Sequence, residues 1–156
     1  MRISDILDET VVRVNLKGKS KDEVISQMIA IVNNSPKVQD IEKVREAIFE
    51  REKIMSTGVG NGFAIPHGKT DAVSDIVAAF AITEEPIDYE SLDEQPVRLI
   101  FLLVGKDSMV GPHIKLLSRI SRLMNKEEFR GKLLNAQTQK EVIEIFKTEE
   151  ATYFES

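Results

Sequence analysis

The sequence has no cysteine and no tryptophan, and only two of its 156 residues are histidines. Without cysteine there is no disulfide framework, no iron–sulfur cluster and no thiolate nucleophile. No apolar run approaches the roughly 20 residues that span a bilayer, and the opening MRISDILDETVV lacks the basic and apolar regions of a signal peptide. We therefore expect a protein of the cytoplasm that is not inserted in a membrane.

Clustered positive charge is missing as well. The net charge is −5, and no block of lysine or arginine is longer than two residues. Nucleic-acid binding relies on clustered cations that contact phosphates, so we expect no nucleic-acid partner. Two histidines without cysteine and without an H-x-x-x-H spacing are a poor set of metal ligands, so we expect no metal and no cofactor.

The apolar pattern predicts strands that alternate with amphipathic helices. Strands are expected over 11–16, 76–83 and 97–104. The last of these, VRLIFLLV, is expected to be covered on both faces. Helices are expected over 20–32, 40–51 and 112–125, with two more after them and a frayed tail over 149–156. This pattern is typical of one domain, residues 1–156, in which helices cover both sides of a sheet.

Helix starts are marked by residues that favour the first turn. Ser20 and Glu23 fit a capping box, and Pro112 fits the first position of the third helix. Asn125 and Thr138, each with a glutamate three residues later, are interpreted as the caps of the two final helices.

The stretch STGVGNGFAIPHGKT, residues 56–70, holds four of the eight glycines and one of the two histidines, His67. GVGNG lacks the spacing of a dinucleotide-binding G-x-G-x-x-G, and GKT would complete a Walker A motif only if Phe63 were glycine. Other interpretations are a tight turn with a surface histidine, or a loop that presents His67 to a partner. In the second case Val59, Phe63 and Ile65 would form an apolar rim for docking.

Two further residues favour the functional interpretation. Arg51 takes the next place in an apolar helical stripe, and His113 opens a stripe of the third helix. Each alone is compatible with packing, as a snorkelling arginine or a buried histidine. Together with His67 they suggest a metal-free anion site, because the first turn of a helix attracts anions and an imidazole can carry a phosphoryl group.

The segment REKIMSTGVGNGFAIPHGKT resembles the active-site segment of enzyme IIA components of the bacterial phosphoenolpyruvate:sugar phosphotransferase system, in the fructose–mannitol class. The similarity extends over about residues 3–147. The resemblance implies an α/β fold with a mixed β-sheet flanked by α-helices on both faces. It also implies that His67 is phosphorylated on its tele nitrogen, that Arg51 stabilises the phosphate, and that His113 is a second active-site histidine. The loop around the phosphate would consist of Gly58, Gly60, Gly62, Gly68 and Lys69.

The resemblance also implies partners. The donor would be the phosphorylated protein HPr or its nitrogen-branch paralogue, and the acceptor a cysteine of an enzyme IIB domain, with docking to a membrane transporter. Two functions remain open: a phosphocarrier for uptake of a fructose-type sugar, and a nitrogen-regulatory enzyme IIA that controls partners without feeding a transporter. A third class, a binding module that is never phosphorylated, would make His67 structural only.

Overall fold

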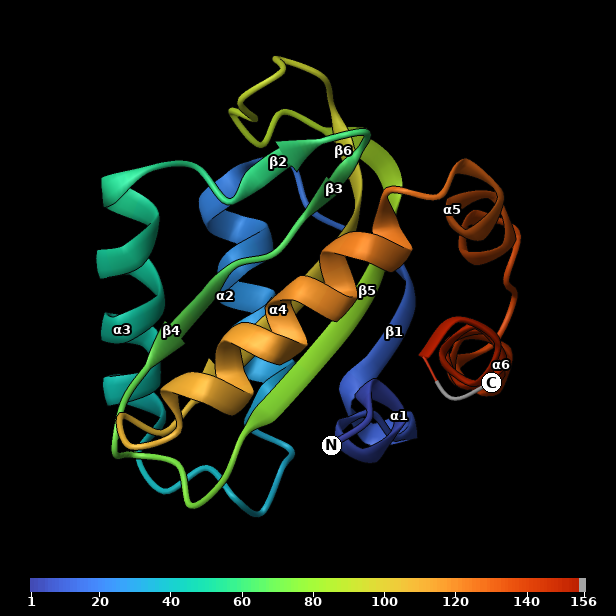
Figure 1. The fold of residues 1–156 in the computed structure, drawn as a ribbon. Helices are drawn as coiled ribbons and strands as arrows, with labels where there is room; N and C mark the ends of the chain where they lie inside the picture. Colours follow the sequence, from blue (N-terminus) through green and yellow to red (C-terminus); the bar gives the residue numbers. More distant parts are fainter. Residues whose placement is uncertain (155–156) are drawn as a thin grey trace.

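Figure 1 shows a computed structural model of the chain, which describes residues 1–154, as a mixed sheet between helices. Five strands follow one another across the sheet in the order β1 (Val12–Leu16), β5 (Val77–Ile87), β6 (Val97–Gly105), β3 (Phe63–Ala64) and β2 (Gly58–Gly60). A sixth strand, β4 (His67–Lys69), continues the path of β3 along β6. β1 runs parallel to β5, β3 and β4 run parallel to β6, and the pairs β5–β6 and β2–β3 are antiparallel.

Helices cover both faces of this sheet, which confirms the expected fold class. The helical elements are α1 (Ile3–Ile6), a 3-10 turn η1 (Glu9–Val11), α2 (Lys21–Val32), α3 (Ile41–Ile54), α4 (Val110–Met124), α5 (Glu127–Leu134) and α6 (Gln139–Phe154). In Figure 1, α4 crosses the front of the sheet, α2 lies behind it against β5, and α3 packs beside β4. None of the helices in residues 1–154 has the length and apolar character needed to cross a bilayer.

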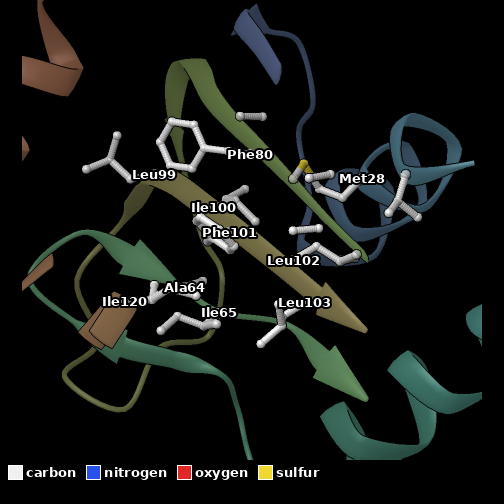
Figure 2. Close-up of a cluster of buried hydrophobic side chains, with 14 of the residues drawn as sticks. Met28, Ala64, Ile65, Phe80, Leu99, Ile100, Phe101, Leu102, Leu103 and Ile120 are labelled. Atoms are coloured by element: carbon white, nitrogen blue, oxygen red, sulfur yellow. The ribbon is translucent and has the colours of Figure 1, made fainter. Parts of the chain in front are cut away.

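The central strand β6 is buried on both faces, as the sequence VRLIFLLV predicted. Its residues 99–104 are at most 1% exposed. Side chains alternate between the two faces of a strand, and Figure 2 shows Met28 of α2 and Ile120 of α4 on either side of β6. On the face towards α6, Phe80 and Phe101 contact Phe146, with ring centroids 5.1 and 5.7 Å from it. This packing makes β6 the rigid element beside which β4 is held.

Two of the predicted helix caps are confirmed. Ser20 Oγ accepts the backbone N–H of Glu23 at 3.2 Å, and Thr138 Oγ1 accepts that of Glu141 at 3.1 Å. The return bond of the capping box differs, because the Glu23 carboxylate accepts the N–H of Lys19 rather than that of Ser20.

Two other predicted starts are wrong. Asn125 ends α4 instead of opening α5, which begins after Lys126 without a side-chain cap. α4 begins at Val110, so Pro112 is its third residue rather than its first. Proline is still tolerated there, because the first N–H groups of a helix have no intrahelical partner.

The tail expected from residue 149 is helical as far as Phe154, so that expectation is wrong over 149–154. Glu150 is 1% exposed, and its carboxylate accepts the backbone N–H groups of Ile3 at 2.5 Å and Ser4 at 2.8 Å. These hydrogen bonds connect α6 to α1. Residues 155 and 156 lie outside the described part of the chain.

Candidate active site

The glycine-rich stretch forms three short strands rather than one loop around His67. β2 and β3 are joined by a tight turn at Gly60, Asn61 and Gly62, whose φ angles are 121°, 58° and 80°. Glycine adopts such positive φ angles without the steric penalty of a Cβ atom. The Asn61 side chain donates to Asn125 Oδ1 at 3.3 Å, at the C-terminal end of α4. The turn thus lies at the opposite end of α4 from His113 (Figure 1).

The structure therefore does not bring Gly58, Gly60 or Gly62 to His67. A Cβ atom at Gly58 would overlap the Ser91 hydroxyl, so this glycine allows close packing of the 88–96 connector. Glycine is needed in this segment for a hairpin and for packing, and only Gly68 belongs to the surroundings of the histidine.

β4 positions His67, Gly68 and Lys69 by the alternation of its side chains. His67 and Lys69 pair with Leu103 and Gly105 of β6 and share one face, while Gly68 points to the other. A Cβ atom at Gly68 would lie 3.1 Å from the backbone of Ala47 in α3, which is tighter than normal packing. Glycine at 68 therefore lets α3 approach the edge of the sheet, and with it Arg51.

The imidazole of His67 is held in one orientation by its own backbone. Nδ1 lies 2.8 Å from the carbonyl oxygen of Ile65. A carbonyl can only accept, so Nδ1 carries the proton and Nε2 carries the lone pair of the neutral ring. Burial lowers the pKa of His67 below its ordinary 6.5, against the opposing effect of the Ile65 hydrogen bond, and Arg51 lowers it further. The ring is thus neutral at pH 7, with Nε2 as its free nucleophilic atom.

His113 lies beside His67 and faces the body of the protein, as its helical stripe predicted. The two ring centroids are 5.9 Å apart and the rings are inclined by 51°. The side chain is 3% exposed, and neither ring nitrogen has a hydrogen-bond partner among residues 1–154. Burial, helped by the nearby His67 and Lys69, lowers its pKa to about 4. An unpaired buried polar group costs about 1–3 kcal/mol, so this imidazole is placed for a ligand rather than for stability.

The backbone N–H of His113 itself is not free to bind an anion. It is the fourth residue of α4, and its N–H donates to the Met109 carbonyl at 3.0 Å. What makes room for its ring is Gly105, at the end of β6, where a Cβ atom would overlap Nδ1 of His113. Sequence reasoning missed Gly105, because a glycine after an apolar run indicates only the end of a strand.

Arg51 is half-buried in the last turn of α3, and its Nη1 donates to the Met55 carbonyl at 2.9 Å. One of its five N–H groups is used in this bond, so the guanidinium is anchored without being saturated. The next residue, Glu52, is 8% exposed and was also missed. A glutamate between Arg51 and Lys53 resembles an ordinary solvated residue of a charged helix end.

These groups line a cleft of about 770 Å³ between α3, β4 and α4. Its lining includes His67, His113 and Arg51, with Gly68 and Lys69 from β4 and the basic residue Lys53. The acidic residues Glu50 and Asp107 are also part of the lining. The lining thus combines one nucleophilic nitrogen with cationic residues and an unpaired imidazole, a set of groups suited to a phosphoryl group.

The apolar rim of this cleft differs from the one expected. Phe63 and Ile65 are 2% and 4% exposed, so they belong to the core and do not form a docking surface. Val59 is exposed, but it lies on the hairpin. The most exposed apolar residues of the lining are Ile54 of α3, 79% exposed, and Ile114 of α4, 59% exposed.

Residues 5–149 match the sequence family described as "Phosphoenolpyruvate-dependent sugar phosphotransferase system, EIIA 2". The chain is 37% identical over 145 residues to the fructose-specific EIIABC component of Bacillus subtilis. That match covers 93% of the chain but only 23% of the larger protein. The chain is also 34% identical to the nitrogen regulatory protein of Bradyrhizobium diazoefficiens, and this match covers 97% of the chain and 99% of its relative.

A solved structure supports the same relationship. The nitrogen regulatory protein IIA-Ntr of Neisseria meningitidis is 30% identical and superposes with a TM-score of 0.86. The superposition covers 92% of this chain and 98% of that one.

Proposed function

Because the chain belongs to the EIIA 2 family of the phosphoenolpyruvate-dependent sugar phosphotransferase system, we propose that it accepts a phosphoryl group on Nε2 of His67 from phosphorylated HPr and passes it to an enzyme IIB. The process served is uptake of a fructose-type sugar, in keeping with the name of the Bacillus subtilis relative. The observation that carries this proposal is the pair of neutral imidazoles, one with its Nδ1 tied to a carbonyl and the other buried without a partner.

Transfer to His67 is a displacement at phosphorus. The Nε2 lone pair forms the new P–N bond while the bond between phosphorus and the donor's imidazole nitrogen breaks. The proton on Nδ1 stays in its hydrogen bond to the Ile65 carbonyl, which stabilises the positive charge that the ring gains. No proton has to leave the acceptor ring, because the attacking nitrogen carries none.

The phosphoryl oxygens take up most of the charge in such a transfer, so catalysis is mainly positioning and charge stabilisation. Arg51 supplies guanidinium N–H groups from one side of the cleft, and Lys69 supplies a cation from β4. His113 supplies one N–H donor in its neutral form, and it has no competing partner among the described residues. The exposed apolar side chains of Ile54 and Ile114 at the mouth offer a surface for a partner protein.

Single-turnover transfer tests this proposal. Phospho-HPr is mixed with the protein, and the phosphorylated product is then mixed with purified IIB domains of fructose-type transporters. We expect rapid transfer in both steps and a loss of both in His67→Ala. Failure of the second step with every fructose-type IIB would contradict the role in sugar uptake.

A second candidate function is that of a nitrogen-regulatory enzyme IIA, whose phosphorylation state controls partner proteins. Two observations favour it: the end-to-end match with the Bradyrhizobium diazoefficiens protein and the TM-score of 0.86 with IIA-Ntr of Neisseria meningitidis. In this case the first transfer succeeds and no IIB is phosphorylated. The genes beside this one provide a separate test, since a IIB/IIC transporter gene implies uptake and an alternative sigma-factor region implies regulation.

A further inference from the structure

Glu52 is a buried carboxylate that holds the start of the segment leading to His67. It is 8% exposed, and its oxygens accept the Thr57 backbone N–H at 2.8 Å and the Thr57 hydroxyl at 2.5 Å. Lys21, at the first residue of α2, pairs with it at 2.8 Å. A carboxylate this buried is costly unless it is paired and hydrogen-bonded, and here both conditions are met.

Thr57 connects this carboxylate to the histidine through two backbone steps. Its carbonyl accepts the N–H of Ile65 at 3.0 Å. The carbonyl of the same Ile65 accepts Nδ1–H of His67 at 2.8 Å. Successive hydrogen bonds at Thr57, just before β2, and at Ile65, just after β3, therefore link Glu52 of α3 to the imidazole ring.

Tyr89 closes the network on its far side. It is fully buried, its hydroxyl lies 2.9 Å from Thr57 Oγ1, and it donates to Glu52 Oε1 at 3.3 Å. Burial, followed by the nearby Glu52 charge, raises the pKa of the phenol well above its ordinary value, so Tyr89 remains a donor. Every strong acceptor site of the carboxylate is thus occupied, which fixes the position of Thr57.

We propose that Glu52 is a positioning residue for His67: through Thr57 and Ile65 it holds the imidazole in the Nδ1–H tautomer with Nε2 directed into the cleft. The proposal rests on the proposed function in one respect, since the consequence for transfer requires His67 to be the nucleophile. A partner group commonly fixes a histidine's tautomer by a direct hydrogen bond. Here Glu52 acts indirectly, by fixing the positions of Thr57 and Ile65. Loss of the Glu52 contacts would release Thr57, and with it the Ile65 backbone whose carbonyl holds Nδ1–H of His67.

Glu52→Met tests the proposal, because methionine has a similar length but accepts no strong hydrogen bond. The direct readout is the ¹⁵N chemical shifts of the His67 ring, which separate a protonated from an unprotonated nitrogen without any partner protein. We expect the wild type to show one tautomer, protonated at Nδ1, and Glu52→Met to show a mixture. Transfer from phospho-HPr should slow by about 10- to 100-fold, by analogy with removal of the outer hydrogen-bond partner of a metal-ligating histidine.

Two variants make the test specific. Glu150→Met removes another buried carboxylate that accepts two backbone N–H groups, but at α1 and α6, away from His67. It should lower the melting temperature while leaving the His67 shifts and the transfer rate unchanged. Glu52→Gln keeps an acceptor for the Thr57 N–H, so it should retain the wild-type tautomer even though the charge is lost.

Wild-type shifts in Glu52→Met would overturn the proposal, as would equal changes in Glu150→Met. If Glu52→Met does not fold, the double variant Lys21→Met/Glu52→Met, which leaves no unpaired charge, replaces it with the same expectations. If the shifts change as expected but even the wild type takes no phosphate from HPr, the positioning role stands and the proposed function fails.

Discussion

Acid should destabilise this protein through His113, and the size of the effect follows from its burial. The folded state lowers the pKa of His113 from 6.5 to about 4, because the buried ring resists protonation. Between these two values the unfolded chain binds a proton that the folded chain does not. Stability is therefore complete above pH 6.5, falls as the pH decreases towards 4, and falls no further below that.

The difference between the two pKa values corresponds to about 3 kcal/mol of unfolding free energy, at 1.36 kcal/mol per pH unit. That is a large share of the roughly 5–15 kcal/mol that stabilises a typical domain. His67 acts in the same direction, since burial lowers its pKa too.

His113→Leu isolates the effect, because leucine has a similar volume and does not titrate. Each protein is unfolded in urea at pH 7 and at pH 4, which gives the unfolding free energy that each loses over this range. The contributions of the carboxylates cancel when the two losses are compared. We expect the wild type to lose about 3 kcal/mol more than the variant over this range. Equal losses would refute the reasoning that His113 is buried in its neutral form.

Three further predictions concern the surroundings of the cleft. Gly105→Ala should displace the His113 ring and slow transfer from phospho-HPr by about 10- to 1000-fold, as for loss of an oxyanion donor, whereas Gly131→Ala, with open space around it, should not change the rate. Gly60→Ala, at φ 121°, should lower the unfolding free energy by about 1–3 kcal/mol. It should not slow transfer, because the hairpin turn is remote from His67. A loss of rate as large as that of Gly105→Ala would contradict this. Arg51→Lys should recover only part of the transfer rate lost in Arg51→Ala, since lysine keeps the charge without the planar fork; equal rates in wild type and both variants would leave Arg51 with a packing role alone.

The fold could be predicted from the sequence where its pattern is long and periodic. The run VRLIFLLV is apolar at nearly every position because helices cover both faces of β6. Helical periodicity was informative in the same way. Arg51 ends one apolar stripe and His113 begins another, and both stripes face the body of the protein, beside the cleft. The prediction at Asn125 was wrong because asparagine suits both ends of a helix, and here only two residues separate the end of α4 from the start of α5.

The surroundings of His67 were harder to predict, because strands of two or three residues have no periodicity to read. The glycines at 58, 60 and 62 were assigned to the phosphate, whereas they serve a hairpin and its packing against the connector. Glu52 was missed because its partners Lys21, Thr57 and Tyr89 come from other elements of the chain. Only the folded chain shows that a helix-end glutamate is buried and linked to the histidine.

The central claim, that Nε2 of His67 carries the phosphoryl group, is tested most directly by incubating the protein with phosphoenolpyruvate, enzyme I and HPr. Mass analysis and ³¹P–¹⁵N spectroscopy of the product then locate the phosphate. We predict one phosphoryl group on Nε2 of His67, lost in acid and retained in base, and none in His67→Ala. A phosphate of the same lability in His67→Ala, or a phosphate on Nδ1 in the wild type, would contradict the account.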